Sequence, residues 1–67
     1  MYCFNIFVGL SLVIDKIDNN EDKVHVVVLE NGKSSSARWH NVHYTKRGNY
    51  IMKWRQRFYL DDFIKVG

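Results

Sequence analysis

The side chains best suited to chemistry in this sequence are cations, and they are concentrated in its second half. Residues 33 to 57 contain seven Lys and Arg residues and no acid, whereas residues 1 to 32 contain five acids and two bases. Cationic side chains neutralise phosphate groups, and aromatic rings stack on nucleobases. The segregated charge therefore predicts a surface that binds nucleic acid. Its expected members are Arg38, Lys46, Arg47, Lys53, Arg55, Arg57 and Tyr59.

Three of these cations alternate along a segment that we expect to be a strand. Lys53, Arg55 and Arg57 would then stand about 6.6 to 6.8 Å apart on one face, close to the phosphate spacing of an extended single strand. We expect His40 and His43 on the same face of the neighbouring strand. Two alternatives stay open, namely a solvated cationic face that only discourages edge association and a face that meets an acidic protein.

The remaining reactive side chains do not form a catalytic or metal-binding set. Cys3 lies in an apolar segment with no base nearby in the sequence, so we expect an inert thiol. His40 and His43 lack further ligands at a zinc-binding spacing. Asp61 and Asp62 are adjacent and would face opposite ways in an extended segment. We therefore predict a binding module that is not an enzyme and needs neither cofactor nor metal.

The strands that position these residues must be formed by a chain of 67 residues. This length allows one domain, so we interpret residues 1–67 as a single domain. Val, Ile, Thr and aromatic residues make up more than a third of the chain, and alanine occurs once. This composition favours strands over helices. We predict an all-β fold with five short strands in a small, strongly bent antiparallel sheet or barrel. An SH3-like barrel is the preferred form and an OB-like barrel is the alternative.

The first fourteen residues carry no charge. Apolar side chains occupy every even position from 4 to 14, which predicts one half-buried strand with a bend or bulge at Gly9. The run has no basic start and ends at Asp15, so we expect neither a secretory signal nor a membrane span. Together with the single cysteine, this favours a cytoplasmic location.

The Asn31-Gly32 pair is the strongest turn signal in the chain, because a type I′ hairpin turn needs positive φ at two consecutive positions. We also expect a β-bulge near His40-Asn41 that lets Val42 and Tyr44 reach the core. Counting from the turn predicts a register. Its pairs are Glu30 with Lys33, Val28 with Ser35, Val26 with Ala37, and Val24 with Trp39. The valines, Ala37 and Trp39 would then face the core, and His25 would face Arg38 on the other side.

Alternation continues after a turn at residues 46–49, where Gly48 can adopt positive φ. Residues 50–60 are predicted to form one strand, and Asp61-Asp62 to break it before a short last element at 63–66. Gln56 would be the one inward polar residue of this strand. The expected inward apolar residues are Tyr50, Met52, Trp54, Phe58 and Leu60.

The same alternation leaves apolar side chains on the outer side of the sheet, which monomers rarely expose together. They could dock a protein, as a regulator or inhibitor of a host protein or in a homodimer, unless the chain folds over and covers them. Abundant Asn, Lys and Ile with one Ala is typical of a phage or mobile-element product. The expected interface residues are Phe7, Val27, Leu29 and Ile51, with Val13 beside them.

Overall fold

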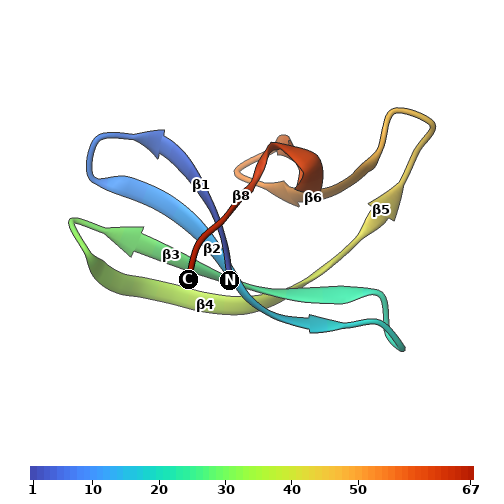
Figure 1. The fold of residues 1–67 in the computed structure, drawn as a ribbon, viewed down its shortest axis with the longest axis horizontal. Coiled ribbons are helices and arrows are strands. Elements are labelled where there is room, and N and C mark those ends of the chain that lie inside the picture. The colour runs from blue at the N-terminus through green and yellow to red at the C-terminus, as the bar shows by residue number, and fades with distance from the viewer.

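The computed structural model describes all 67 residues and contains eight strands arranged in two antiparallel sheets (Figure 1). The strand orders are β4-β3-β2-β1-β8 and β5-β6-β7. The all-β prediction is confirmed, although the larger sheet is not closed into a barrel. No helix is long and apolar enough to cross a membrane. The elements are β1 (Tyr2–Phe7), β2 (Leu10–Asp18), β3 (Lys23–Glu30), β4 (Lys33–Asn41), β5 (His43–Tyr44), β6 (Asn49–Lys53), β7 (Gln56–Tyr59), the 3-10 turn η1 (Leu60–Asp62) and β8 (Ile64–Lys65).

Residues 4–14 do not form one strand, because the chain reverses between β1 and β2 at Val8-Gly9. Gly9 has a φ of 89°, and its carbonyl accepts a hydrogen bond of 2.7 Å from the Asn31 backbone amide. Phe4 pairs with Leu12, so even positions still share a face on both strands. Val8 is the exception, since it sits in the turn and is 98% exposed. The expected bend at Gly9 is therefore a complete reversal of the chain.

The β3–β4 hairpin confirms the predicted turn but corrects the register. Asn31 and Gly32 have φ values of 53° and 80°. Ser35 is left out of the ladder, so a bulge there shifts every later pair by one residue. The prediction of a bulge near His40-Asn41 placed it at the wrong end of the strand. The observed pairs are Glu30 with Lys33, Leu29 with Ser34, Val28 with Ser36, Val26 with Arg38, and Val24 with His40.

This shift changes which side chains of β4 face the core. Trp39 pairs with His25, and their ring centroids lie 5.2 Å apart on the outer side of the sheet. Ala37 pairs with Val27 on the same outer side. The expectation that Trp39 and Ala37 fill the core is wrong, because one extra residue moves a whole strand segment to the other face.

The junction between the two sheets is tied to the β2–β3 turn. Val42 packs against the core, and its backbone amide donates a hydrogen bond of 2.8 Å to the Asp22 carbonyl. Tyr44 is exposed and does not fill the core as expected, but its hydroxyl donates a hydrogen bond of 2.8 Å to the Asp22 carboxylate. These contacts fix how β5 leaves β4.

Residues 50–60 also form a hairpin rather than one strand. The chain reverses at Trp54-Arg55, where both residues have positive φ (52° and 62°). Ile51 pairs with Phe58 and both side chains are buried, so the inward assignment of Phe58 is confirmed. The inward assignments of Tyr50, Met52 and Trp54 are wrong, since the buried residue of β6 is Ile51.

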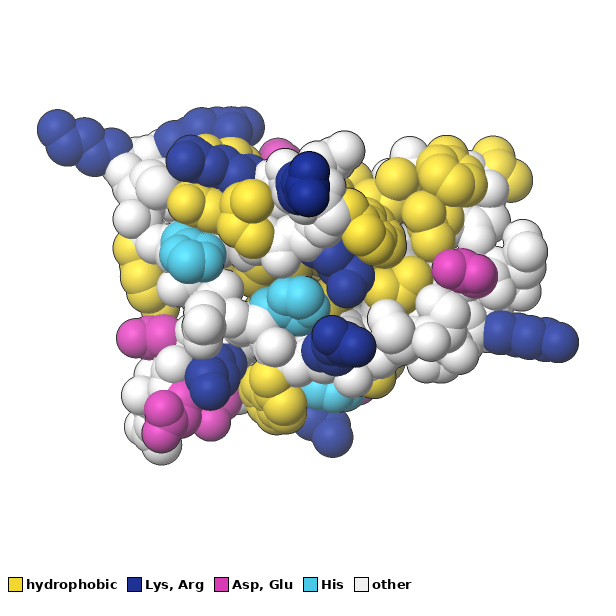
Figure 2. Space-filling model, turned by 180° about the vertical axis from the view of Figure 1, so that it is seen from behind, with side chains coloured by type: hydrophobic (Ala, Val, Ile, Leu, Met, Phe, Trp, Pro, Cys, Tyr) yellow, Lys and Arg dark blue, Asp and Glu magenta, His cyan; other side chains and the backbone are white.

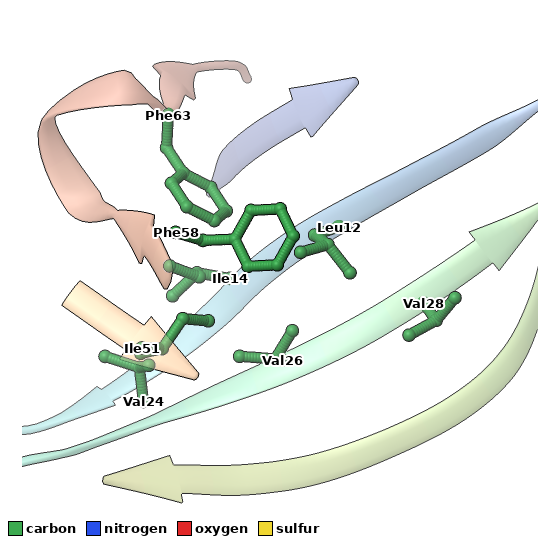
Figure 3. Packing of buried hydrophobic residues seen from close by; sticks show 8 residues of the cluster. All are labelled: Leu12, Ile14, Val24, Val26, Val28, Ile51, Phe58 and Phe63. Carbon is green, nitrogen blue, oxygen red and sulfur yellow. The ribbon is translucent and has the colours of Figure 1, made fainter. Parts of the chain in front are cut away.

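The hydrophobic core lies between the two sheets (Figure 3). Phe63 enters it just after η1, which breaks the chain at Asp61-Asp62 as predicted. The short last strand then pairs with β1, where Ile64 lies opposite Cys3 and the two termini come together (Figure 1). The large sheet contributes Leu12, Ile14, Val24, Val26 and Val28, and the chain after β5 contributes Ile51, Phe58 and Phe63.

Candidate nucleic-acid interface

The outer face of the β5–β6–β7 sheet carries a row of three aromatic rings. Ile51 and Phe58 use the inner face, so the neighbouring pairs His43–Tyr50 and Tyr50–Tyr59 point away from the core. The His43 ring stacks on Tyr50 with centroids 5.0 Å apart and an interplanar angle of 21°. The Tyr50 and Tyr59 rings follow at 5.4 Å. The row therefore crosses all three strands of the small sheet.

Two arginines lie over this row. The turn before β6 is closed by Thr45, whose hydroxyl donates a hydrogen bond of 2.7 Å to the Gly48 carbonyl. Gly48 adopts the predicted positive φ, at 155°. From this turn the Arg47 guanidinium reaches 3.7 Å from the centroid of the Tyr59 ring. Arg57, on β7, lies 4.5 Å from the centroid of Tyr50.

We call His43, Arg47, Tyr50, Arg57 and Tyr59 the arginine–tyrosine surface. The Arg57 Nη1 atom donates a hydrogen bond of 3.4 Å to the Tyr59 hydroxyl. This bond, and a second from Arg47, lower the pKa of Tyr59, because a donor stabilises the phenolate. The bond to Tyr59 likewise raises the pKa of Arg57.

The lysines and arginines of the chain form no direct ion pairs. The only ion pair within 4.0 Å joins His25 to Asp15 at 2.6 Å, so no Lys or Arg contacts a carboxylate. Lys and Arg side chains gather around the β5–β6 end of the molecule, at the upper left of Figure 2. Acidic side chains gather at the β2–β3 turn, at the lower left, where Asp18, Glu21 and Asp22 lie. The guanidiniums of this surface therefore have no direct carboxylate partner, although Asp61 lies near the Gly48 turn.

The structure brings together only part of the predicted set. Arg47, Arg57 and Tyr59 lie on the arginine–tyrosine surface, and Lys46 occupies the same turn as Arg47. The expected stripe of Lys53, Arg55 and Arg57 does not form, because the reversal at Trp54-Arg55 interrupts the strand. Arg55 stands at the hairpin tip instead.

Lys53 and Arg38 lie on the inner side of their strands, near His40. Burial lowers the pKa of His40, and the nearby positive charge of Lys53 lowers it further. The His40 Nε2 atom is buried without a hydrogen-bond partner. His40 and His43 therefore do not share a face as expected, since only His43 is on the outer row.

Tyr50 belongs to the arginine–tyrosine surface, although the alternation of residues 50–60 predicts it in the core. The signal that could have found it is Gln56, an inward polar residue in an otherwise apolar alternation. A turn just before Gln56 places it opposite Lys53 at the exposed end of the inner face, and it reverses the facing of residues 50 to 53. Tyr50 then joins Tyr59 on the outer side.

The hairpin tip is a second notable feature of the small sheet. Trp54 is 49% exposed, and Lys53 Nζ lies 5.2 Å from its ring centroid. Trp54 and Arg55 both have positive φ, a conformation that costs non-glycine residues roughly 1–2 kcal/mol each. Strained backbone of this kind concentrates at functional sites. The tip presents an aromatic ring and a cation side by side.

The predicted protein-interface residues are dispersed. Phe7 is 64% exposed next to the β1–β2 turn. Val27 and Leu29 are half-buried on the outer face of the large sheet. Ile51 is fully buried in the core, so its assignment to an exposed face is wrong.

No protein-family model matches the chain, and neither a curated protein nor a solved structure matches it. The pockets in the structure have volumes of about 120 to 280 Å³, and none is lined by the arginine–tyrosine surface. No group of three His, Cys, Asp or Glu side chains is placed to hold a metal ion. The arginine–tyrosine surface is thus an open face rather than a cavity.

Proposed function

We propose that the protein binds single-stranded nucleic acid through the arginine–tyrosine surface. The observation that carries this proposal is the row of three rings across β5–β6–β7 with two unpaired guanidiniums lying over it. Guanidinium groups bind phosphates in a bidentate fashion, and exposed rings offer stacking platforms to unpaired bases.

A single strand fits this surface better than a duplex does. The His43 ring is exposed, and the Tyr50 and Tyr59 rings are half-buried on an open face. Base faces are accessible for stacking only when the bases are not paired with a second strand. The cations flank the rings, so phosphates can lie beside the stacked bases. Lys46 next to Arg47, and the Trp54-Arg55 tip, would lengthen the contact at either end of the small sheet.

The proposal is tested by fluorescence anisotropy with labelled oligonucleotides of DNA and RNA, single-stranded and duplex. Each single-strand phosphate contact contributes about 0.7 to the slope of log affinity against log salt. Contacts by Arg47 and Arg57 therefore predict a slope of about −1.4, and steeper if Lys46 or Arg55 also binds. Single strands should bind more tightly than the duplex of the same sequence.

Matched variants identify the surface. Arg47→Ala and Arg57→Ala should each weaken binding and reduce the slope by about 0.7. Lys33→Ala removes the same charge from the distant β3–β4 turn and should leave the affinity close to that of the wild type. A salt-independent affinity, or equal losses in Lys33→Ala and Arg57→Ala, would refute the proposal. Binding of labelled heparin without binding of any oligonucleotide would instead favour an acidic protein as the ligand.

For the fold, we propose that the strongly bent sheet has an SH3-like architecture. Support comes from the strand order, in which the last strand returns beside the first after a 3-10 turn. Pairing of the last strand with the first brings an open sheet of short strands closer to a closed barrel. The OB-like alternative has less support because the chain is short for it.

A further inference from the structure

The outer face of the five-stranded sheet is not covered by any element of the chain. The small sheet and Phe63 pack on its inner face, which carries the core cluster. Val13 is 7% exposed yet does not belong to that cluster, because it points to the outer side between its neighbours on β1 and β3. The large sheet thus has one packed face and one bare face.

The middle of the bare face is apolar. Cross-strand pairing places one residue from each of the five strands in a continuous row. The row runs Ile64, Cys3, Val13, Val27 and Ala37. Leu29 and Trp39 lie on the same face of the sheet, two residues from Val27 and from Ala37 respectively.

The charge on this face suits a second copy of the chain. The charged groups of the face lie towards one end, where the Asp15–His25 pair is followed by Lys16 and by the cross-strand pair of Asp18 and Lys23. None of the cations of the arginine–tyrosine surface or of the hairpin tip is on the face. Two copies of a protein with net charge +3 can therefore stack here without bringing their basic regions together.

The available area is also of the right size. The surface of the chain is 4943 Å², whereas a folded monomer of 8.0 kDa exposes about 4,450 Å². The five strands together contain 34 residues, which at a rise of about 3.3 Å and a strand spacing of about 4.8 Å give a footprint on the order of 540 Å². Side chains standing out from the sheet raise its accessible area towards the roughly 800 Å² that each partner contributes to a stable interface.

We propose that the outer face of β4-β3-β2-β1-β8 is an interface with a second copy of this chain, related by a two-fold axis. In such a pair the same apolar row contributes from both copies, so each substitution in it acts twice. The proposal does not depend on nucleic-acid binding, because the arginine–tyrosine surface belongs to the other sheet.

The unmodified protein gives the first test, by sedimentation velocity from about 1 µM to about 200 µM without nucleic acid. The mass should rise from 8.0 kDa to twice that value. Cys3 is the only cysteine and lies in the apolar row, so its alkylation rate should fall several-fold over the same range. A constant monomer mass with a constant alkylation rate would overturn the proposal, as would growth beyond two copies.

Substitutions then locate the interface. Ala37 and Ile64 are exposed in the single chain, so Ala37→Arg and Ile64→Lys should fold normally. Each should weaken dimerisation at least tenfold, because the interface would have to bury one unpaired charge from each copy. Val8→Lys adds the same charge at a 98% exposed position outside the face and should leave dimerisation unchanged. Equal weakening in Val8→Lys would place the contact elsewhere and reject this interface.

Discussion

The Trp54-Arg55 turn can be replaced by the sequence that the same protein uses in its β3–β4 hairpin turn. Asn31 and Gly32 have positive φ values of 53° and 80°, and Trp54 and Arg55 have 52° and 62°. Asn-Gly is the preferred pair for this conformation, whereas Trp-Arg is poorly suited to it. We therefore predict that Trp54→Asn combined with Arg55→Gly raises the stability of the protein.

The magnitude follows from the contacts of the tip. Relief of the left-handed conformation contributes roughly 1–2 kcal/mol at each of the two positions, less at Asn than at Gly. The Trp54 ring contacts Phe58 edge-on at 6.3 Å and Lys53 at 5.2 Å. Losing these two exposed contacts costs about 1–2 kcal/mol together. The net gain is about 1 kcal/mol, which raises the Tm of so small a domain by about 4–8 °C.

Thermal unfolding followed by circular dichroism measures the effect. The matched control is Gly32→Arg, since a side chain at Gly32 meets no atom within 4 Å and only the backbone conformation opposes it. That variant should lose about 1 kcal/mol. A double variant at Trp54-Arg55 that melts at or below the wild-type Tm would refute the reasoning about strain.

The same double variant tests why the strain is retained. Loss of a stacking ring costs about 1–3 kcal/mol per base in single-strand binding, and loss of one cation reduces the salt slope by about 0.7. The variant should therefore be more stable but bind oligonucleotides at least fivefold more weakly. Wild-type affinity in the stabilised variant would show that the tip does not contact the ligand.

Three further substitutions test the fold. Ile51→Val should lower the free energy of unfolding by about 0.5–1.5 kcal/mol in urea titrations, because Ile51 is fully buried. Gly9→Ala should cost at least about 1 kcal/mol in the same assay, since the new methyl group would lie 2.6 Å from Asn31 Oδ1 at a φ of 89°. The hydrogen bond from His25 lowers the pKa of Asp15, so its stabilisation is present above the ordinary carboxyl pKa and is lost as the pH falls below about 4. Asp15→Asn should accordingly lose less stability than the wild type between pH 5 and pH 3 in pH-dependent melting curves.

The parts of the fold that the sequence predicts correctly are those with a strong local signal. Asn31-Gly32 fixes one hairpin because few other pairs accept two positive φ values. Asp61-Asp62 ends a strand because two adjacent acids fit neither face of a buried sheet. These signals depend on a few neighbouring residues and need no knowledge of the rest of the chain.

The errors have a common physical cause. The alternation of apolar and polar side chains can continue unbroken through a turn or a bulge, so it does not reveal where the chain reverses. The turn at Val8-Gly9 pairs Phe7 with Leu10, and a bulge at Ile6 then shifts the register so that even positions pair with even positions. The pattern of one long strand and of this hairpin is therefore the same. The bulge at Ser35 falls in a run of three serines, where no apolar side chain fixes the register. The turn at Trp54-Arg55 has no favourable turn residue at all. The candidate site depends on this last turn, so only its cationic composition could be predicted.

The two proposed surfaces belong to opposite layers of the molecule, which makes their tests independent. The apolar row faces away from the core on the large sheet, and the arginine–tyrosine surface faces away from it on the small one. Stacking two copies through their large sheets would leave both arginine–tyrosine surfaces exposed on opposite outer sides, too far apart for one short oligonucleotide to contact both. Ala37→Arg should therefore abolish dimerisation without changing short-oligonucleotide affinity, and Arg57→Ala should do the reverse. A variant that lost both properties together would mean that the two sheets do not act as separate layers.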